Sequence, residues 1–322
     1  MVEESKAMAT QDSHIIAVDW GSSSFRAYLL NSSWELVDQC KNDHGVLNTS
    51  NEFSDILENA ITNWLHRYSI RQIIMGGMIG SRNGWIETAY SQCPVNATEH
   101  ARHAEILETH LNVPVKVLQG VQGKSPCAYP DVMRGEEVQI FGVCQTMATQ
   151  DKQTETIVCL PGTHSKWVSL QNQAIQSFAT LMTGELFAMI QKFSSIGSLI
   201  TDQKFAKESF LTGLLDQNNQ TVTDIEQNNP GLLHSLFSVR ARAVSNTLDV
   251  ESVYSYLSGL LIANEIHTAN RLFTLPEEVI LVTDHKFKEI YSLALTQLGF
   301  KVKYLDSVQA FLQGIRQLVE DC

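Results

Sequence analysis

The chain has 322 residues, of which 43% are apolar, and it carries a formal net charge of −12 at pH 7. This length predicts two domains, and an acidic balance without a basic stripe excludes nucleic acid and anionic membranes as partners. The six cysteines are scattered without a CxxC pair, so we expect neither a zinc site nor disulfides, and a reducing cytoplasm as the location. Residues 1–13 are polar and lack an apolar leader, which predicts a flexible tail.

The stretch IIAVDWGSSSFRAYLL, residues 15–30, predicts a hairpin. Its first apolar strand ends in Asp19, the chain turns through a glycine and three serines, and a second strand resumes at 25–30. A glycine lets backbone N–H groups approach an anion closely, and Asp19 is placed to hold Mg²⁺ through water. The donors of this predicted phosphate site are Gly21, Ser22, Ser23 and Arg26. A hairpin with a merely solvated tip is the alternative that this motif alone leaves open.

Strands and helices alternate through the rest of the first half. We expect strands at residues 34–40, 71–75 and 113–118, and helices at 53–65 and 135–149. The first helix should begin behind a capping box formed by Thr49 and Glu52. The polar residues 150–156 are the expected crossing between two domains, 14–152 and 153–322.

The hairpin pattern recurs later in the chain. VCLPGTHSKWVSL, residues 158–170, overlays residues 17–29 at an offset of 141, so that Gly162 falls on Gly21. Two such units indicate a duplicated fold whose hairpin tips face each other across a cleft and clasp the β- and γ-phosphates of one nucleotide. The opposing phosphate contacts would be Gly162, Thr163 and His164. Strand alternation leaves the direction of Lys166 open, and a lysine in a strand is most often solvent-facing.

The second half repeats the order of the first. Strands are expected at 156–160, 166–170 and 174–179, then a helix from Thr183, a helical insertion broken by a polar loop at 216–230, and a long helix at 249–273. The chain should end with strand 279–283, helix 287–298, strand 301–305 and a helix from Ser307. A meander followed by alternating helices and strands predicts a mixed sheet flanked by helices.

Six motifs occur in a fixed order: DWGSSSFR, GGMIGSRNGW, DVMRGEE, LPGTHSKWV, MTGELF and YLSGLLIANE. Together they make the chain similar to the 2-dehydro-3-deoxygalactonokinase family of the sugar kinase, actin and heat-shock ATPase superfamily. The resemblance covers nearly the whole chain after about residue 13. It implies an α/β, two-domain, duplicated actin-like ATPase (ribonuclease H-like) fold with an interdomain cleft. It also implies phosphorylation of a 2-keto-3-deoxy sugar acid by ATP.

The resemblance places the catalytic base in DVMRGEE, residues 131–137. Glu136 is the first candidate to accept the proton of the substrate hydroxyl, and Asp131 is the second. Acidic residues also complement a helix N-terminus, which is the alternative role of Glu136. Arg134 has a planar fork that suits a substrate carboxylate, so we expect it beside the base.

The stretch GGMIGSRNGW, residues 76–85, is too rich in glycine for a helix and should be a loop that lets backbone approach a ligand. Its expected sugar-acid contacts are Gly77, Met78, Ser81, Arg82 and Trp85, the last as a wall or a packing residue. Two arginine-bearing glycine loops in one chain are what a small acidic substrate needs.

The long helix carries Ser258 and Gly259, and together with the strand that follows it should cradle the adenosine of ATP. Gly259 permits close approach, although a buried helix contact explains it equally well. The chain departs from its relatives after that strand, where Thr283 and Asp284 stand in place of a glycine. We expect these larger side chains, Thr283 at the site itself, to crowd the purine or the ribose.

These features favour a kinase that uses MgATP to phosphorylate 2-dehydro-3-deoxy-D-galactonate at its 6-hydroxyl in galactonate catabolism. The alternatives are a 2-keto-3-deoxygluconate kinase and, because of Thr283 and Asp284, a catalytically weak sensor of sugar acid or nucleotide. An actin-like filament has no support, because the sugar-site loops would then serve no purpose. The expected partners are the sugar acid and ATP, and the sequence leaves the oligomeric state open, with a homodimer as one candidate.

Overall fold

The computed structural model describes residues 13–50, 52–146, 155–216 and 231–320. The predicted tail, nearly all of the predicted crossing at 150–156 and nearly all of the predicted loop at 216–230 therefore lie outside the described residues. Within the described ranges, no helix is both long and apolar enough to cross a membrane.

The first half is built on a six-stranded sheet. Its strands are β1 (Ser13–Trp20), β2 (Phe25–Leu30), β3 (Leu36–Asn42), β4 (Ser69–Gly77), β7 (Glu105–Leu107) and β8 (Val115–Val117), in the order β3-β2-β1-β4-β8-β7. β1 is antiparallel to β2 and parallel to β4. Its apolar run is buried on both faces: Ile15 and Ala17 pack into a core with Phe311, and Ile16 and Val18 into a second core with Phe53. A strand with two covered faces is a continuous apolar run, which is why the sequence predicted it.

The second half repeats this sheet. Its strands are β11 (Thr156–Leu160), β12 (Ser165–Gln171), β13 (Ala174–Leu181), β14 (Glu278–Thr283) and β15 (Lys301–Asp306), with β6 (Val95–Asn96) added from the first half, in the order β15-β14-β11-β12-β13-β6. If β7, which is antiparallel to β8 at the edge of the first sheet, is left aside, the remaining five strands of the first sheet and the five of the second half lie in the same order, with an antiparallel meander followed by two parallel strands. The duplicated fold that the repeat predicted is therefore confirmed.

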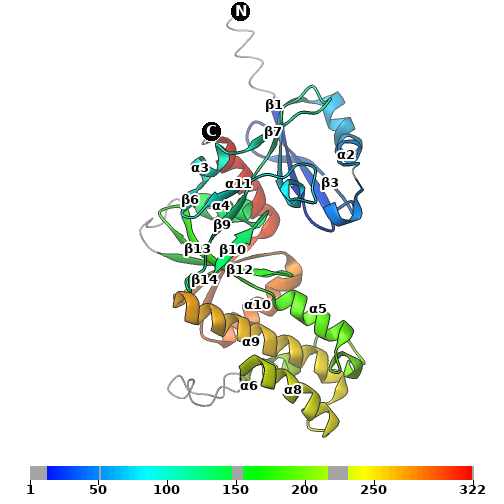
Figure 1. The fold of residues 1–322 in the computed structure, drawn as a ribbon, viewed down its shortest axis with the longest axis vertical. Helices are drawn as coiled ribbons and strands as arrows, with labels where there is room; N and C mark the ends of the chain where they lie inside the picture. The colour runs from blue at the N-terminus through cyan, green and yellow to red at the C-terminus, as the bar shows by residue number, and fades with distance from the viewer. Residues whose placement is uncertain (1–12, 51, 147–154, 217–230, 321–322) are drawn as a thin grey trace, which may run out of the picture.

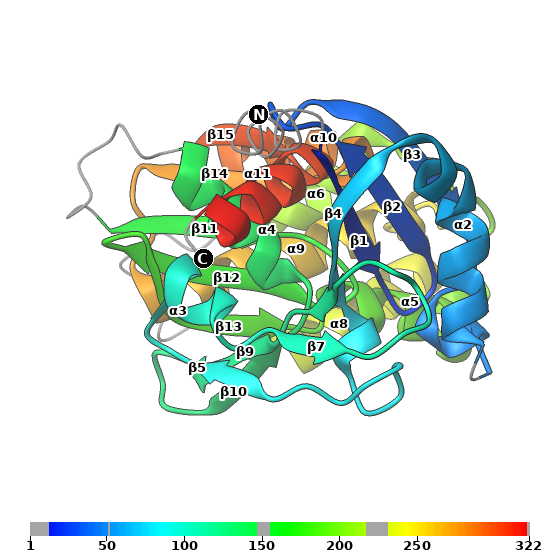
Figure 2. The same cartoon turned by 90° about the horizontal axis from the view of Figure 1, so that it is seen from above.

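Two helices cross at the centre of the molecule, α4 (Glu136–Thr146) and α11 (Ser307–Glu320) (Figures 1 and 2). A Cβ added to Gly142 would lie 1.8 Å from the carbonyl oxygen of Ala310, and one added to Gly314 would lie 1.8 Å from that of Val138. The two contacts are reciprocal, so the helices are related by an approximate two-fold axis. Only glycine lets the backbones approach this closely.

The segment between β4 and α4 was not predicted in detail. It contains α3 (Ala97–Ala101) and a three-stranded sheet, β10-β9-β5, made of β5 (Tyr90–Gln92), β9 (Gly120–Lys124) and β10 (Pro130–Met133). β6 leaves this segment to pair with β13 at the edge of the second sheet, where Val95 lies opposite Ile175. The segment thus belongs to the first half in sequence and lies against the second half in space (Figure 1).

The remaining helices flank the sheets. They are α2 (Phe53–Arg67) beside the first sheet, and α5 (Thr183–Phe193), α6 (Lys207–Asp216), α8 (Gly231–Val244), α9 (Val253–Phe273) and α10 (His285–Gln297) in the second half (Figure 1). The predicted capping box of α2 does not form, because the N-cap residue Glu52 makes no side-chain cap and the Thr49 hydroxyl donates to the Gly45 carbonyl at 2.9 Å. The long helix α9 follows the prediction, preceded by one 3₁₀ turn at Val250–Ser252.

Candidate active site

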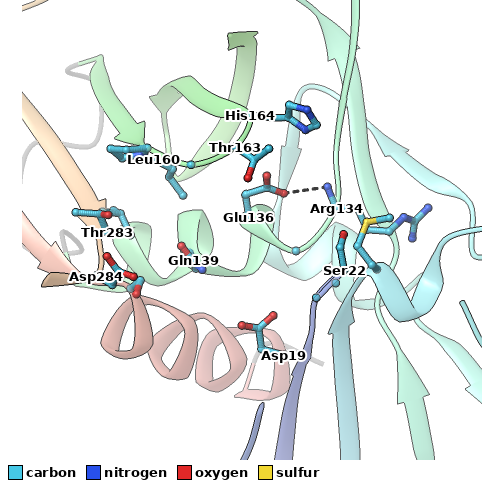
Figure 3. Close-up of a pocket in the computed structure, with 18 of the residues that line it drawn as sticks. Asp19, Ser22, Arg134, Glu136, Gln139, Leu160, Thr163, His164, Thr283 and Asp284 are labelled. Atoms are coloured by element: carbon cyan, nitrogen blue, oxygen red, sulfur yellow. Dashed lines mark hydrogen bonds between the residues drawn. The ribbon is translucent and has the colours of Figure 1, made fainter. Parts of the chain in front are cut away.

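A cavity of about 380 Å³ lies between the two halves, and both repeated turns line it (Figure 3). The first turn contributes Asp19, Gly21 and Ser22, the second contributes Gly162, Thr163 and His164, and α4 contributes Glu136. In Figure 3, Glu136 lies between Thr163 on one side and Asp19 on the other. The structure thus brings together the residues that the repeat predicted to face one another.

The first turn is supported from behind. The backbone N–H of Gly21 donates to the Ser24 carbonyl at 2.9 Å, and a Cβ on Gly45 would lie 2.3 Å from the Ser23 carbonyl carbon, so the loop carrying Gly45 braces the tip. Ser23 itself is exposed and does not line the cavity. The turn therefore presents backbone and the Ser22 hydroxyl to the cavity.

Asp19 faces Arg26 across the β1–β2 ladder. The Arg26 guanidinium donates to the Asp19 carboxylate at 3.2 Å, and Arg26 does not line the cavity, although we expected it to contact phosphate. Desolvation by burial raises the pKa of the Asp19 carboxyl, while Arg26 opposes that shift. Arg26 thus affects this site through its ion pair with Asp19, because it offsets the negative charge of the carboxylate that faces the cavity.

The second turn is open toward the cavity. A Cβ on Gly162 would meet nothing within 4 Å, so ligand atoms have room at this backbone. The turn is fixed from the α5 side: the Glu185 backbone N–H donates to the Thr163 carbonyl at 2.9 Å, and the Glu185 carboxylate lies 2.5 Å from His164 Nε2. Glu185 therefore holds the turn by both its backbone and its side chain.

Lys166 is a residue whose direction the sequence left open. It is 4% exposed, and its Nζ donates to Glu136 Oε1 at 2.8 Å and to the His164 carbonyl at 3.1 Å. Alternation could not reveal this, because six successive residues of β12 are buried and both faces of the strand are covered. The side chain reaches from the second sheet to the first residue of α4.

The structure separates the two candidate bases. Glu136 lines the cavity, and its Oε2 accepts the Arg134 backbone N–H at 3.2 Å (Figure 3). Asp131 lies on β10 outside the lining, with its two oxygens accepting the Thr180 backbone N–H at 2.6 Å and the Thr180 hydroxyl at 2.7 Å. Asp131 joins β10 to β13, and Glu136 is the carboxylate of DVMRGEE that faces the cavity.

Glu137 was not among the site residues predicted from the sequence, and it is fully buried. Burial, followed by the nearby Glu136 carboxylate, raises the pKa of Glu137 to about 8. One of its oxygens accepts the Gly135 backbone N–H at 2.6 Å, and Oε1 has no hydrogen-bond partner among the described residues. Gly135 has φ of +108°, a conformation that favours glycine, so Glu137 holds the turn that presents Glu136.

The sugar-acid loop is partly in the cavity and partly away from it. Gly77 and Met78 line the cavity, and Gly77 has φ of +96° with a Cβ position only 2.7 Å from the Trp20 carbonyl oxygen. Ser81, Arg82 and Trp85 do not line it. Trp85 stacks on Phe53 with ring centroids 6.4 Å apart, which is the packing role that the sequence allowed.

The Arg134 guanidinium is engaged by the protein itself. It donates to the Thr88 hydroxyl at 2.5 Å and to the Thr88 carbonyl at 2.9 Å, and it lies over the Tyr90 ring at 4.3 Å. Arg134 also lines the cavity, so its stem and backbone face the ligand side while the fork braces the segment around Thr88.

A second cavity, of about 310 Å³, adjoins the first at Gly162, Thr163 and Phe287. It lies between α5, α9 and α10, where we expected adenosine. Ser258 lines it, but Gly259 does not: a Cβ there would lie 2.0 Å from the Phe210 carbonyl oxygen, because α6 packs on that face of α9. The expected close approach of a nucleotide to Gly259 is therefore replaced by a helix contact.

The departure from the relatives after β14 has a structural role. Asp284 is the N-cap of α10, and its carboxylate accepts the backbone N–H groups of Lys286 at 3.0 Å and Phe287 at 3.4 Å. Thr283 is 4% exposed and lines the first cavity. The Asp284 side chain is thus turned to the helix end.

A buried polar cluster behind the second turn escaped the sequence reasoning. Glu265 of α9 accepts Trp167 Nε1–H at 3.0 Å and the Tyr291 hydroxyl at 2.9 Å. Burial raises the pKa of Glu265, and hydrogen bonds from Thr183, Trp167, Tyr291 and Ser165 oppose the shift. The one available signal was a lone glutamate inside an apolar helix.

The donor set suits a hydrated Mg²⁺ bridging to phosphate. In the parts of the chain that the structure describes, no group of three His, Cys, Asp or Glu side chains is arranged to hold a metal. Mg²⁺ usually keeps several waters and is bound through one or two carboxylates and the substrate phosphates, a role that Asp19 in the cavity lining can support.

Two duplicated halves, each with a glycine-hydroxyl turn facing one cavity, define a two-domain ATPase-fold phosphotransferase. Residues 19–318 match the family described as 2-keto-3-deoxy-galactonokinase. The chain is 30% identical to the Escherichia coli protein named 2-dehydro-3-deoxygalactonokinase, over 94% of this chain and 96% of that protein. The chain therefore belongs to the 2-keto-3-deoxy-galactonokinase family, a family of kinases, and the resemblance seen in the six motifs is confirmed.

Other relatives agree with this assignment. A Rhizobium meliloti protein described as a probable 2-dehydro-3-deoxygalactonokinase is 30% identical, over 95% of this chain and 96% of that protein. A crystal structure of a candidate 2-dehydro-3-deoxygalactonokinase from Sinorhizobium meliloti is 29% identical, with a TM-score of 0.84, and covers 95% of this chain and 98% of that chain.

Proposed function

We propose that this protein transfers the γ-phosphoryl group of ATP to the 6-hydroxyl of 2-dehydro-3-deoxy-D-galactonate, giving the 6-phosphate and ADP in galactonate catabolism. The observation that carries the proposal is that both repeated turns and Glu136 line one cavity between the halves. Membership of a 2-keto-3-deoxy-galactonokinase family supports the choice of substrate.

Glu136 is the proposed catalytic base. Its carboxylate faces the cavity, whereas Asp131 lies on β10 outside the cavity lining. Glu136 accepts the proton of the 6-hydroxyl as that oxygen attacks the γ-phosphorus; the new O–P bond forms while the bond from phosphorus to the β–γ bridging oxygen breaks. The electron pair of that bond leaves with ADP, and the proton passes from Glu136 to solvent.

The repeated turns are the proposed phosphate donors. Gly21, Ser22, Gly162, Thr163 and His164 line the cavity from its two sides and would supply hydroxyls, an imidazole and, at the second turn, backbone N–H groups, whereas Ser23, which we expected among these donors, lies outside the lining. Asp19 would hold Mg²⁺ through water, with Arg26 compensating its charge. When bound, Mg²⁺ neutralises negative charge on the phosphate oxygens.

The two ends of the site take the two substrates. The second cavity, with Ser258 on one wall, would hold the adenosine, and Thr283 would face it from the first cavity. The sugar acid would lie at the end carrying Gly77, Met78 and Arg134. Ser81 and Arg82 would reach its carboxylate when the halves close, a motion that also excludes water from the γ-phosphate.

The alternative of a sensor is less favoured at Asp284, whose carboxylate caps α10, but Thr283 and Asp284 both line the first cavity, so the assay below keeps this alternative as one of its outcomes. The domains that we propose remain residues 14–152 and 153–322, and β6 of the first domain pairs with β13 in the sheet of the second.

A coupled assay of ADP release with MgATP tests the proposal. It compares 2-keto-3-deoxygalactonate, 2-keto-3-deoxygluconate and no sugar, with Glu136→Gln as the matched variant that keeps size and loses the base. We expect release with the galactonate derivative that is nearly abolished in Glu136→Gln. Release with the gluconate derivative alone would reassign the substrate, and binding of either sugar acid without release would favour the sensor.

A further inference from the structure

A buried cation lies directly behind the cavity lining and is used by no part of the proposed chemistry. Lys166 has a side chain that is 5% exposed, and it belongs to β12, immediately after the second phosphate turn. Its ammonium donates to Glu136 at 2.8 Å and to the His164 carbonyl at 3.1 Å. One side chain thus touches both the candidate base and the turn that would bind phosphate.

A second bridge lies beside the first. Lys166 is the cross-strand neighbour of Thr180 on β13, and Thr180 donates twice to Asp131, which is five residues before Glu136 in the sequence. Two adjacent residues of the second sheet therefore hold the two ends of the segment that carries the base. This segment is anchored to the half that carries the second turn, although it is part of the first half in sequence.

The charges around Glu136 show what this cation does. Glu136 begins α4 next to the buried Glu137, and the charge of Glu136 raises the pKa of Glu137 and of Asp19 on β1. The cations on the other sides are Lys166, Arg134, whose fork is turned to Thr88, and Arg26, which is paired with Asp19. His164 points to Glu185. Lys166 is the cation with a hydrogen bond to the Glu136 carboxylate among the described residues.

We propose that Lys166 is a positioning residue of the kinase, whose ammonium pairs with the Glu136 carboxylate among neighbouring carboxylates and fixes it in register with the second phosphate turn. The inference rests on the proposed role of Glu136 as the base. A base must be ionised to accept the hydroxyl proton, and a hydrogen-bonded cation favours the ionised form of a carboxyl. The contact to the His164 carbonyl fixes where that cation sits.

The test is the pH profile of kcat/KM for the sugar acid in the full-length chain. Lys166→Met keeps the length of the side chain and removes the charge. We expect kcat to fall at least about tenfold and the acid limb of the profile to move to higher pH by about one unit or more, the size of effect expected when a carboxyl loses a charged neighbour. Lys166→Arg keeps the charge, so its acid limb should stay near that of the wild type even if kcat falls.

Lys303→Met on β15 is the matched control, because it removes an exposed lysine of the same sheet that lies outside both cavities. If Lys166→Met does not fold, Lys166→Gln keeps a donor without the charge and should move the acid limb in the same direction. A folded, charge-free variant whose acid limb stays at the wild-type position would overturn the inference while the wild type remains active. An inactive wild type would overturn the proposed function, and this inference with it.

Discussion

Asp131 and Thr180 are joined across the two halves by two hydrogen bonds, from the Thr180 backbone N–H at 2.6 Å and from its hydroxyl at 2.7 Å to the same carboxylate. Both donors would be left without an acceptor if Asp131 were shortened. The pair ties β10, which leads directly to the turn before α4, to the strand beside β12.

Asp131→Ala should therefore weaken the fold more than the chemistry. The pair is only partly buried, so leaving the two Thr180 donors without partners should lower the free energy of unfolding in urea by about 1 kcal/mol, the lower end of the cost of unsatisfied buried donors. Asp131→Asn, which keeps one accepting oxygen, should lose less. Turnover of either variant should exceed that of Glu136→Gln; the reverse order would make Asp131 the base.

Two glycines should respond to alanine in opposite ways. Gly142→Ala places a methyl 1.8 Å from the Ala310 carbonyl oxygen, so α4 and α11 must separate, and we expect a loss of about 1–3 kcal/mol or failure to fold. Gly162→Ala has open space around its new methyl and should keep its melting temperature. If Gly162 approaches phosphate, that variant raises the KM for ATP. Gln145→Ala, elsewhere on α4, is the control for helix propensity.

Substitutions at Asp284 test directly whether this side chain crowds the purine or the ribose of the nucleotide, as the sequence suggested. Asp284→Ala removes the cap of α10 and should cost about 0.5–2 kcal/mol in thermal unfolding, whereas Asp284→Gly should cost only a few tenths. We expect neither change to tighten ATP binding in a calorimetric titration. A clear gain in affinity for the glycine variant would revive crowding as an explanation.

Glu137 should make stability depend on pH. Its folded-state pKa is raised from 4.5 to about 8, so the folded state binds more protons than the unfolded state between those values. The free energy of unfolding should then fall as the pH rises through this window. Glu137→Gln cannot ionise and should flatten this part of the stability curve. Urea titrations at pH 5 and pH 8 give the free energy of unfolding at each pH. If it changes between these two pH values as much in Glu137→Gln as in the wild type, Glu137 is not the group responsible.

The sequence predicted the sheets well, because apolar runs end in glycine turns at both repeats, and β1, β11, β14 and α9 follow the predicted ranges closely. It did not predict β5, β6 or β7, since strands of two or three residues are too short to display a period. The expected helix cap at Thr49 was wrong because α2 begins at Phe53, so that Glu52 and not Thr49 is its N-cap residue.

The sequence predicted which residues occur at the candidate site, but it predicted less well where their side chains point. The turns could be found because hydroxyls follow a glycine at the end of a buried strand. Sequence could not choose between Asp131 and Glu136, because that choice depends on Thr180, which is 49 residues away. Nor could it show that Lys166 points inward, since a strand covered on both faces carries no alternation.

Because β6 of the first half pairs with β13 in the sheet of the second half, the second half depends on the first. Without residues from the first half, β13 would be the outer strand of its sheet along the part that pairs with β6, with unpaired backbone groups open to any extended segment. A second half produced alone would therefore tend to aggregate, and a first half supplied in trans would tend to rescue it. The sheet of the first half is built from its own strands, whereas that of the second half is completed by a strand from its neighbour.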